Sequence, residues 1–279
     1  MASAPASSAN LGPGFDVIAL ALELRCSVEA TVAERWSVRH VGPEYPRGHF
    51  DSVLDAARRA VGEERPMALV VDNRIPIGRG LGSSAAAAVA GAAAAWRAVG
   101  EEAHHRAVFD LAVAMEDHPD NAAAAVYGGL VLCTPDQQVH RLPLHPGLIP
   151  ILAVPAQGLS TSDARAALAG SVSRDVAVRS LGRLGALIGG LLLGDPVLLA
   201  SAHGDEIHQD ARNRLRPEVE RLMDRARGAG ALHACWSGAG PSVLALAEPE
   251  TAPDVRAGLE GGIGDGRVLE LRMASSGLI

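Results

Sequence analysis

The chain of 279 residues contains no lysine, because all 25 of its basic residues are arginine. A P-loop needs a lysine before its serine or threonine, and a protein kinase needs a strand lysine that contacts the phosphates. A Schiff base needs a lysine amine. The absence of lysine therefore excludes all three mechanisms.

Aromatic residues are also scarce, at 3% of the chain, whereas hydrophobic residues make up 48%. The core is then built mostly from alanine, valine and leucine, and it depends on close helix packing. The length predicts about two domains and is sufficient to bury a real core.

An excess of basic charge is missing too, since the net charge is −7. This balance argues against a nucleic-acid partner. Cys26, Cys133 and Cys235 are odd in number and far apart, which indicates reduced thiols in a cytoplasmic protein rather than a disulfide framework or a zinc site. The longest early apolar run, residues 17–22, is short and meets Glu23, so we expect neither a signal peptide nor a membrane span.

The pattern of apolar and turn-forming residues predicts strands mixed with helices in both halves of the chain. Strands are predicted at residues 27–33, 68–72, 130–133, 149–154 and 243–247. Helices are predicted at residues 50–61 (capped by Asp51 or Ser52), 83–99, 105–116, 176–193 and 217–228, and shorter ones from Asn121 and Asp163. The pattern restarts near residue 146, which predicts an α+β protein with domains at residues 1–145 and 146–279.

The strongest chemical signal is the glycine-rich segment at residues 76–86, which reads PIGRGLGSSAA and leads into an alanine-rich helix. Glycines let the backbone approach a ligand, and a helix start offers unpaired N–H groups and the positive end of the dipole. Ser83 and Ser84 add hydroxyls for phosphate or a metal. A serine-capped structural turn is the alternative, but two serines before a helix of small side chains favour a phosphate loop.

Two further segments are weaker signals. Residues 4–16 read APASSANLGPGFD, in which Asn10 and Asp16 flank a Gly-Pro-Gly turn. Their side chains either converge on a polar ligand or bond within the turn. Residues 237–242, SGAGPS, form a loop of small residues before a strand.

Together these segments resemble the GHMP kinases, a superfamily that includes galactokinase, mevalonate kinase and phosphomevalonate kinase. The homoserine kinase branch is the most similar, because the chain contains, in order, SSANLGPGFD, PIGRGLGSSAAAA, HPDNAAAAVYGGL and SGAGPSVLAL. The resemblance extends from Ala4 to Ala247, and its motifs are long enough to be specific.

The resemblance implies an N-terminal α/β domain, like the second domain of a ribosomal protein, and a ferredoxin-like C-terminal domain, with the active site between them. It implies transfer of the γ-phosphoryl group of ATP to the side-chain hydroxyl of L-homoserine, a step of threonine biosynthesis. Such a transfer needs charge neutralisation and in-line positioning more than covalent help. ATP and Mg²⁺ are the implied cofactors, and the oligomeric state stays open, a homodimer included.

The resemblance also implies roles for individual residues. ATP binding is implied for Pro76, Gly78, Arg79, Gly80, Leu81, Gly82, Ser83 and Ser84. Binding of the amino acid is implied for Asn10, Asp16, His118, Asn121, Thr161, Arg165 and Arg212. Ser84 and Glu116 are the implied Mg²⁺ ligands, and Glu116, His118 and Asn121 are implied to be catalytic.

Several positions depart from the homoserine kinase pattern. The chain starts almost on the first motif, which leaves little sequence for the strand that usually precedes it. Ala114 stands where a second acid is common and Asp117 where glycine is usual, so the metal carboxylate is either Glu116 or Asp117. Arg25 and Cys26 stand where tyrosine and aspartate are frequent.

Two other functions stay open on the sequence. One is a kinase for another small hydroxylated acceptor, and the other is a nucleotide-binding module without catalysis. Mevalonate-type relatives use a lysine–aspartate pair near the acceptor, whereas this chain has no lysine and has Asn121 in place of the aspartate. This difference favours the homoserine branch and predicts that no dedicated side-chain base acts on the acceptor hydroxyl.

Overall fold

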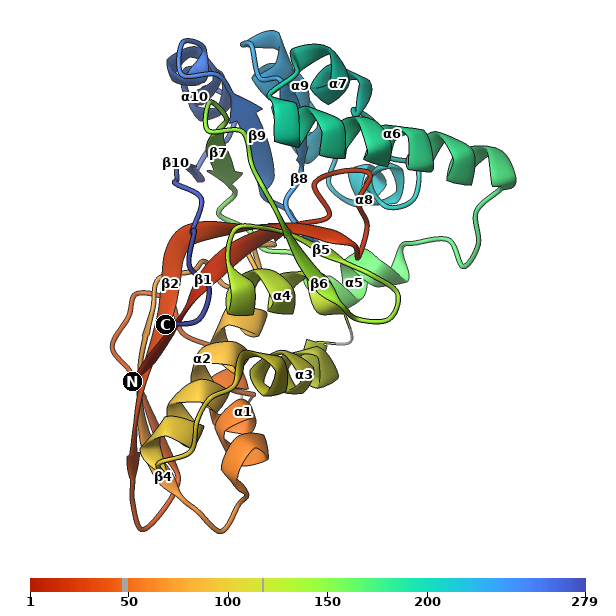
Figure 1. The fold of residues 1–279 in the computed structure, drawn as a ribbon. Coiled ribbons are helices and arrows are strands. Elements are labelled where there is room, and N and C mark those ends of the chain that lie inside the picture. The colour runs from red at the N-terminus through yellow and green to blue at the C-terminus, as the bar shows by residue number, and fades with distance from the viewer. Residues whose placement is uncertain (47–49, 117) are drawn as a thin grey trace.

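The computed structural model describes residues 1–46, 50–116 and 118–279. It contains two β-sheets, and Figure 1 shows one sheet with its helices in the lower half of the molecule and the other in the upper half. The predicted two-domain α+β architecture is confirmed.

The first domain is built on a six-stranded sheet in which β1 pairs with β2 beside the order β3-β4-β2-β5-β6. Its strands are β1 (Ala2–Ala9), β2 (Ile18–Val32), β3 (Ser37–His40), β4 (Met67–Asn73), β5 (Leu130–Cys133) and β6 (Val139–Leu142). β1 is buried along its whole length. The first motif thus supplies the strand that seemed to lack sequence.

Four helices cover one face of this sheet (Figure 1). They are α1 (Ser52–Val61), α2 (Ser83–Ala98), α3 (His105–Glu116) and α4 (Pro119–Tyr127). The predicted cap of α1 is confirmed, because Asp51 Oδ1 accepts from the N–H groups of Val53 and Leu54. α4 was expected to start at Asn121 but begins at Pro119, since the missing N–H and fixed φ of proline suit the first turn of a helix.

The alanine-rich helix α2 lies at the centre of the first domain. Most of its residues are buried, and it is apolar on all sides, as a central helix should be. A Cβ at Gly91 would lie 2.6 Å from the Val53 carbonyl oxygen, so glycine lets α1 approach closely. With few aromatic rings available, this domain gains its packing from small side chains and short distances between helices.

The second domain has a four-stranded antiparallel sheet in the order β10-β7-β9-β8. Its strands are β7 (Ile149–Val154), β8 (His233–Trp236), β9 (Val243–Ala247) and β10 (Arg267–Glu270). α9 (Pro217–Gly228) precedes β8, and α10 (Ala252–Glu260) connects β9 to β10. This topology is ferredoxin-like, as the resemblance implied.

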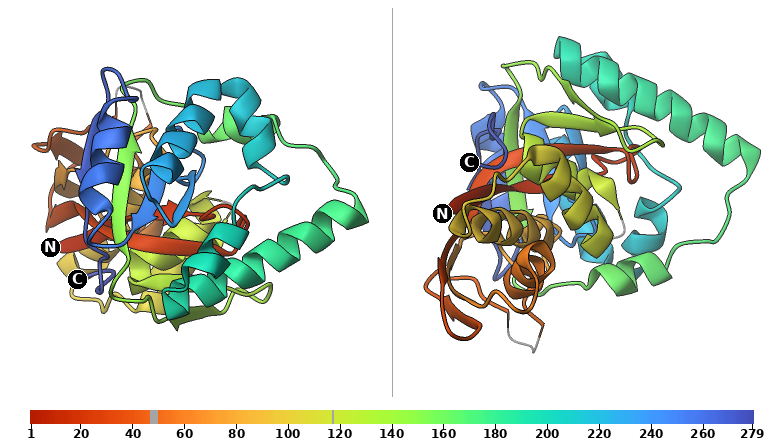
Figure 2. Two further views of the ribbon diagram at one scale, coloured as in Figure 1. Left: turned by 90° about the horizontal axis from the view of Figure 1, so that it is seen from above. Right: turned by 60° about the horizontal axis from the view of Figure 1, so that its bottom comes forward.

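Between β7 and α9 the chain adds α5 (Thr161–Ala166), α6 (Arg174–Leu193), α7 (Pro196–Ser201) and α8 (Gln209–Leu215). Figure 2 shows α6 along the outside of the molecule in both views. The length of α6 and its mean hydropathy of 1.5 would by themselves allow it to cross a membrane. However, Arg179 and Arg183 project from this helix to Glu206, and an ionic cluster of this kind is costly in a bilayer.

The last residues return to the first domain. Ser3 exchanges two backbone hydrogen bonds with Ile279, and Ala274 N–H donates to the Ala21 carbonyl. Arg25 donates to the Gly277 carbonyl at 3.0 Å, which gives this unusual arginine a structural role. The predicted division into residues 1–145 and 146–279 did not include this return.

Candidate active site

Three glycine-containing segments meet between the two domains: residues 4–16, 76–86 and 237–242. Ser237 Oγ donates to the Gly80 carbonyl at 2.8 Å. Gly238 N–H donates to the Ala9 carbonyl at 3.0 Å. The three segments therefore form one structural unit, which we call the glycine junction.

A cavity of about 300 Å³ opens beside the glycine junction. Its walls come from β2, β3, β4 and α1, from the start of α2, from the junction of α3 and α4, and from the start of α5 with the third glycine segment. The predicted residues that line it are Gly78, Gly80, Leu81, Gly82, Ser83, Ser84, Glu116, His118, Asn121 and Thr161. The structure thus brings together most of the predicted nucleotide and catalytic residues.

The three glycines of the predicted phosphate loop, Gly78, Gly80 and Gly82, differ in how much space surrounds them. All have positive φ angles. A Cβ at Gly80 would lie 2.1 Å from the Ser237 carbonyl oxygen, and one at Gly82 would lie 2.0 Å from Ser7 Oγ. Nothing lies within 4 Å of the corresponding position at Gly78. Gly82 lines the cavity, and its missing side chain also makes room for Ser7.

The two serines of this loop also differ. Ser83 is buried, accepts from Asn73 Nδ2 and donates to the Ile75 carbonyl, so its hydroxyl has a structural use. Ser84 is exposed, and its hydroxyl donates to Glu116 Oε1. Ser84 and Glu116 thus place a hydroxyl and a carboxylate side by side at the cavity, where the pair can bind a cation.

The predicted ATP-binding residues Pro76 and Arg79 lie outside this cavity and line a separate hollow. Arg79 Nε donates to the Pro155 carbonyl at 3.0 Å, and Arg79 Nη1 donates to the Ile77 carbonyl at 2.8 Å. A third bond joins Nη2 to the Ala156 carbonyl. Arg79 therefore holds the loop to the second domain, and its guanidinium is not directed at a nucleotide.

The junction of α3 and α4 supplies the residues predicted to hold the acceptor. His118 Nδ1 contacts the Glu116 carbonyl, which suits a protonated Nδ1. Ser7 Oγ donates to Asn121 Oδ1 at 2.7 Å and so fixes the orientation of the amide. Asp120, between them, is fully buried, and burial raises the pKa of its carboxyl to about 6. Its Oδ1 accepts from Asn121 N–H, whereas Oδ2 has no partner among the described residues.

The predicted ammonium ligand and one predicted carboxylate ligand are paired with each other. Arg165 donates from Nη2 and Nη1 to the two carboxylate oxygens of Asp16, at 2.6 Å and 3.1 Å. Arg165 lies one turn after Thr161 on α5. Neither Asp16 nor Arg165 lines the cavity itself, but Thr161 does, and both charged groups are close enough to Asp120 to influence its pKa.

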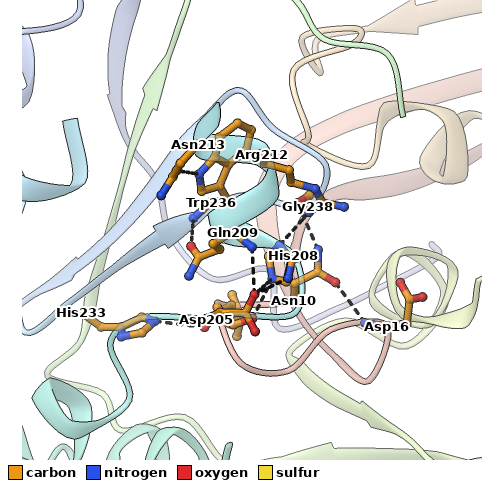
Figure 3. Close-up of polar contacts among 12 residues, drawn as sticks. Asn10, Asp16, Asp205, His208, Gln209, Arg212, Asn213, His233, Trp236 and Gly238 are labelled. Atoms are coloured by element: carbon orange, nitrogen blue, oxygen red, sulfur yellow. Dashed lines mark hydrogen bonds and ion pairs between the residues drawn. The ribbon is translucent and has the colours of Figure 1, made fainter. Parts of the chain in front are cut away.

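The second predicted arginine, Arg212, is almost completely buried, with 1% exposure. Its Nη1 lies 2.8 Å from His208 Nδ1 and donates to the Gly238 carbonyl at 2.9 Å. His208 Nε2 donates to the Gly12 carbonyl at 2.8 Å. Burial lowers the pKa of His208 to about 4, so its ring is neutral and Nδ1 can accept from the guanidinium. Figure 3 shows this network.

Asn10 belongs to the same network (Figure 3). Its Nδ2 donates to the Gly238 carbonyl at 3.0 Å, and its Oδ1 accepts from Asp16 N–H at 3.0 Å. Both polar groups of the side chain are thus engaged within the protein. The structure agrees with the simpler of the two interpretations of this turn, in which Asn10 bonds locally and orients the backbone of Asp16.

Sequence reasoning missed four side chains that support the site. They are Ser7, Phe15, Asp120 and His208. Ser7, Phe15 and Asp120 lie inside the motifs SSANLGPGFD and HPDN, and His208 lies four residues before Arg212, so the available signal was their proximity to the named residues. Asp117, the alternative metal carboxylate, lies outside the described residues.

The chain matches two protein-family models. The GHMP kinases N terminal domain matches residues 48–129, and the GHMP kinases C terminal domain matches residues 179–261. The homoserine kinase of Streptomyces coelicolor is 42% identical over 270 residues, which cover 91% of this chain and 86% of that protein. A homoserine kinase of Thermus thermophilus is 39% identical, with 94% and 95% covered.

Solved structures give the same picture. The homoserine kinase from Cytophaga hutchinsonii superposes with a TM-score of 0.88 at 28% identity, covering 100% of this chain and 96% of that one. The mevalonate kinase of L. major superposes with a TM-score of 0.76 at 17% identity, covering 98% and 96%. The second likeness concerns the fold alone.

Proposed function

The chain belongs to the homoserine kinases of the GHMP superfamily, and from this premise we propose that its cavity is where ATP phosphorylates L-homoserine. The reaction transfers the γ-phosphoryl group to the side-chain hydroxyl and yields O-phospho-L-homoserine, an intermediate of threonine biosynthesis. The observation that supports the residue assignments is the glycine junction, beside which the start of α2, Glu116, His118 and Asn121 line one cavity.

The start of α2 is the part of the cavity that we assign to the phosphates. Its unpaired N–H groups and the dipole of the helix favour anions there. Gly78 has open space around it, so the backbone of the loop is accessible at this point. Since no lysine exists in the chain, the backbone must supply most of the hydrogen bonds.

Ser84 and Glu116 fit a magnesium ion. Mg²⁺ in kinases takes one or two carboxylates and completes its coordination with waters and phosphate oxygens. Among the described residues no three side chains of His, Cys, Asp or Glu gather into a metal site, so the nucleotide would supply further ligands. When bound, Mg²⁺ neutralises charge on the phosphates.

The acceptor hydroxyl is assigned to the junction of α3 and α4. Ser7 fixes the amide of Asn121, and His118 is held by the Glu116 carbonyl, so both side chains are prearranged. They position the hydroxyl, while the loop and the metal stabilise the transferred charge. Asp120 is buried next to them, and burial raises the pKa of its carboxyl to about 6 while Oδ2 has no partner among the described residues.

The experiment that tests this function is ADP release with Mg·ATP against homoserine, threonine, serine and mevalonate. We expect homoserine to be the best acceptor, and the Glu116→Gln variant serves as the control for contaminating kinases. Turnover of another acceptor alone would leave a GHMP kinase of different specificity. Nucleotide binding without turnover of any acceptor would favour a non-catalytic module. We also place the enzyme in the cytoplasm, because its three cysteines are free and buried.

A further inference from the structure

The charged side chains beside the cavity form a balanced group. Asp16 and Asp120 are the acids, and Arg165 and Arg212 are the bases; each influences the charge state of others in the group. Homoserine, as a zwitterion, also carries one charge of each sign. The net charge of the group is therefore the same before and after a zwitterionic amino acid binds.

We propose that the Asp16–Arg165 ion pair is an internal substitute for the substrate, which the ammonium and carboxylate of the amino acid displace. Asp16 exchanges its guanidinium partner for the ammonium group, and Arg165 exchanges its carboxylate partner for that of the substrate. This proposal rests on the proposed function and adds how the site selects molecules that carry both charges.

The geometry of the pair supports an exchange. The two hydrogen bonds of 2.6 Å and 3.1 Å have the bidentate form in which arginine binds a free carboxylate. The side chains of Arg165 and Asp16 are 36% and 31% exposed, so a ligand can reach both. Before an amino acid binds, each member of the pair neutralises the other, so neither charge is left without a partner.

The two arginines are suited to different tasks. Arg212 is buried and held by His208 and the Gly238 carbonyl, so it is a fixed charge. Arg165 is partly exposed on the short helix α5, and Asp16 is its carboxylate partner. Both guanidinium groups lie against the ring of Phe15, with carbon-to-centroid distances of 5.3 Å and 5.7 Å. Phe15 thus contacts both arginines, of which only the partly exposed Arg165 is suited to exchange its partner.

This arrangement discriminates against ligands with a single charge. A molecule with only a carboxylate must break the pair, and it leaves Asp16 without a partner. A molecule with only an ammonium group leaves Arg165 without one. A zwitterion replaces both contacts at once, so the cost of breaking the pair is offset only for an amino acid.

The test uses two analogues of homoserine, each lacking one charge. 4-Hydroxybutanoate lacks the ammonium group, and 3-aminopropan-1-ol lacks the carboxylate. Calorimetry on the whole chain would measure binding of both, and of homoserine, to the wild type, to Asp16→Asn and to Arg165→Gln. Asparagine is chosen because Asp16 has a φ of 57°, a conformation that asparagine tolerates.

We expect a crossed pattern. Asp16→Asn binds homoserine at least about tenfold more weakly than the wild type but binds 4-hydroxybutanoate roughly three- to fivefold more tightly, because Arg165 no longer has to leave a carboxylate. Arg165→Gln shows the reverse preference and gains affinity for 3-aminopropan-1-ol. Asp163→Asn removes the same charge two residues from Arg165 without touching the pair, whose contacts are with Asp16, and should leave all three affinities unchanged.

Two outcomes overturn the exchange. Either both variants weaken both analogues, which indicates direct contacts without an internal pair, or Asp163→Asn reproduces the gain, which indicates general electrostatics. Near-ultraviolet circular dichroism and ADP binding check that the variants are folded. A wild type that phosphorylates homoserine without the crossed pattern contradicts the exchange alone, whereas one that does not use homoserine contradicts the proposed function.

Discussion

The phosphate loop and the amino-acid site adjoin each other but are held together by different means. In the loop, glycine backbone packs on glycine backbone, and the Gly82 position has no room for even a Cβ beside Ser7. In the amino-acid site, partly exposed side chains bond to each other, with Asp16 and Arg165 as the central pair. The loop therefore has one arrangement, whereas the amino-acid site has interchangeable partners.

This difference matters for how each half tolerates change. A backbone contact cannot adjust to an added atom without moving the chain, because close-packed interiors leave little free space. A partly exposed ion pair can open at small cost, since water and salt compensate its charges. Substitutions in the loop should then act on folding, and substitutions in the amino-acid site should act on affinity.

The largest expected effect is that of Gly82→Val. The first carbon of the new side chain would lie 2.0 Å from Ser7 Oγ and 2.9 Å from Asn121 Oδ1, at a positive φ. We expect a loss of about 4 kcal/mol or more in the free energy of unfolding, measured by urea denaturation. Gly78→Ala is the control, because nothing lies within 4 Å there, and it should cost about 1–2 kcal/mol. Equal stabilities would remove the distinction between these glycines.

Within the amino-acid site, replacing Arg212 and replacing Arg165 should have different effects. Arg212→Leu should lower the free energy of unfolding by roughly 3 kcal/mol, because it removes a buried group bonded to His208 and the Gly238 carbonyl. Arg165→Leu should cost at most about 1 kcal/mol in stability but raise KM for homoserine about tenfold. Denaturation and steady-state kinetics on both variants measure the two effects. The fixed and exchangeable roles would be wrong if the variants behaved alike.

Acid pH should weaken the network behind Arg212. Burial lowers the pKa values of His208 and His233 from 6.5 to about 4. As pH falls from 6.5 to about 4, these histidines bind protons in the unfolded chain but not in the folded chain, so the free energy of unfolding falls. Each histidine contributes a loss on the order of 3 kcal/mol.

The contribution of Asp120 to the pH dependence of stability has the opposite sign to that of the two histidines. Its raised pKa of about 6 means that the folded chain takes up its proton first as pH falls, which offsets part of the loss. Urea denaturation at several pH values from neutrality to about 4 measures the slope. His233→Gln should flatten this slope, and Asp120→Asn should steepen it; unchanged slopes would mean that these groups are not the titrating ones.

Glu116→Gln tests the metal position that joins the two regions. The amide keeps the shape but removes the charge beside Ser84, so we expect kcat to fall at least about tenfold and the Mg²⁺ requirement to rise. Titration of activity with Mg²⁺ measures both. Asp117→Asn is the paired control, and a larger effect there would move the metal carboxylate to Asp117.

The smallest expected effect is that of His118→Ala. Because Nδ1 of His118 contacts the Glu116 carbonyl, the ring is held in place where it lines the cavity, as suits a positioning group. We expect a loss of roughly three- to tenfold in kcat/KM with turnover retained. Complete loss of turnover at saturating homoserine would identify His118 Nε2 as a base.

The sequence predicted the long elements well, because their signals are local. The alanine-rich helix, the Asp51 cap and the strand at residues 243–247 depend on neighbours in the chain. The edge strand β10 and short helices such as α7 and α8 carry no strong pattern of their own, and packing against distant residues determines them. The start of α4 was placed too late, since Pro119 is favourable inside the first turn.

The site was predictable in its members but not in their contacts. Glycine and serine spacing indicated the phosphate loop, yet only the structure shows that Arg79 faces the second domain and that Gly82 makes room for Ser7. The partner of Arg165 lies 149 residues away in the chain. No local pattern encodes a contact of that separation, so it had to come from the fold.

The glycine junction has a mechanical consequence for the catalytic cycle. Ser237 to Gly80, Leu159 to Gly78 and Arg79 to Pro155 are bonds that cross from one domain to the other. Rotating the domains apart would break them together and leave several carbonyls without partners. Many kinases admit their substrates by swinging two lobes about a hinge. The bonds of the glycine junction oppose such a swing in this protein.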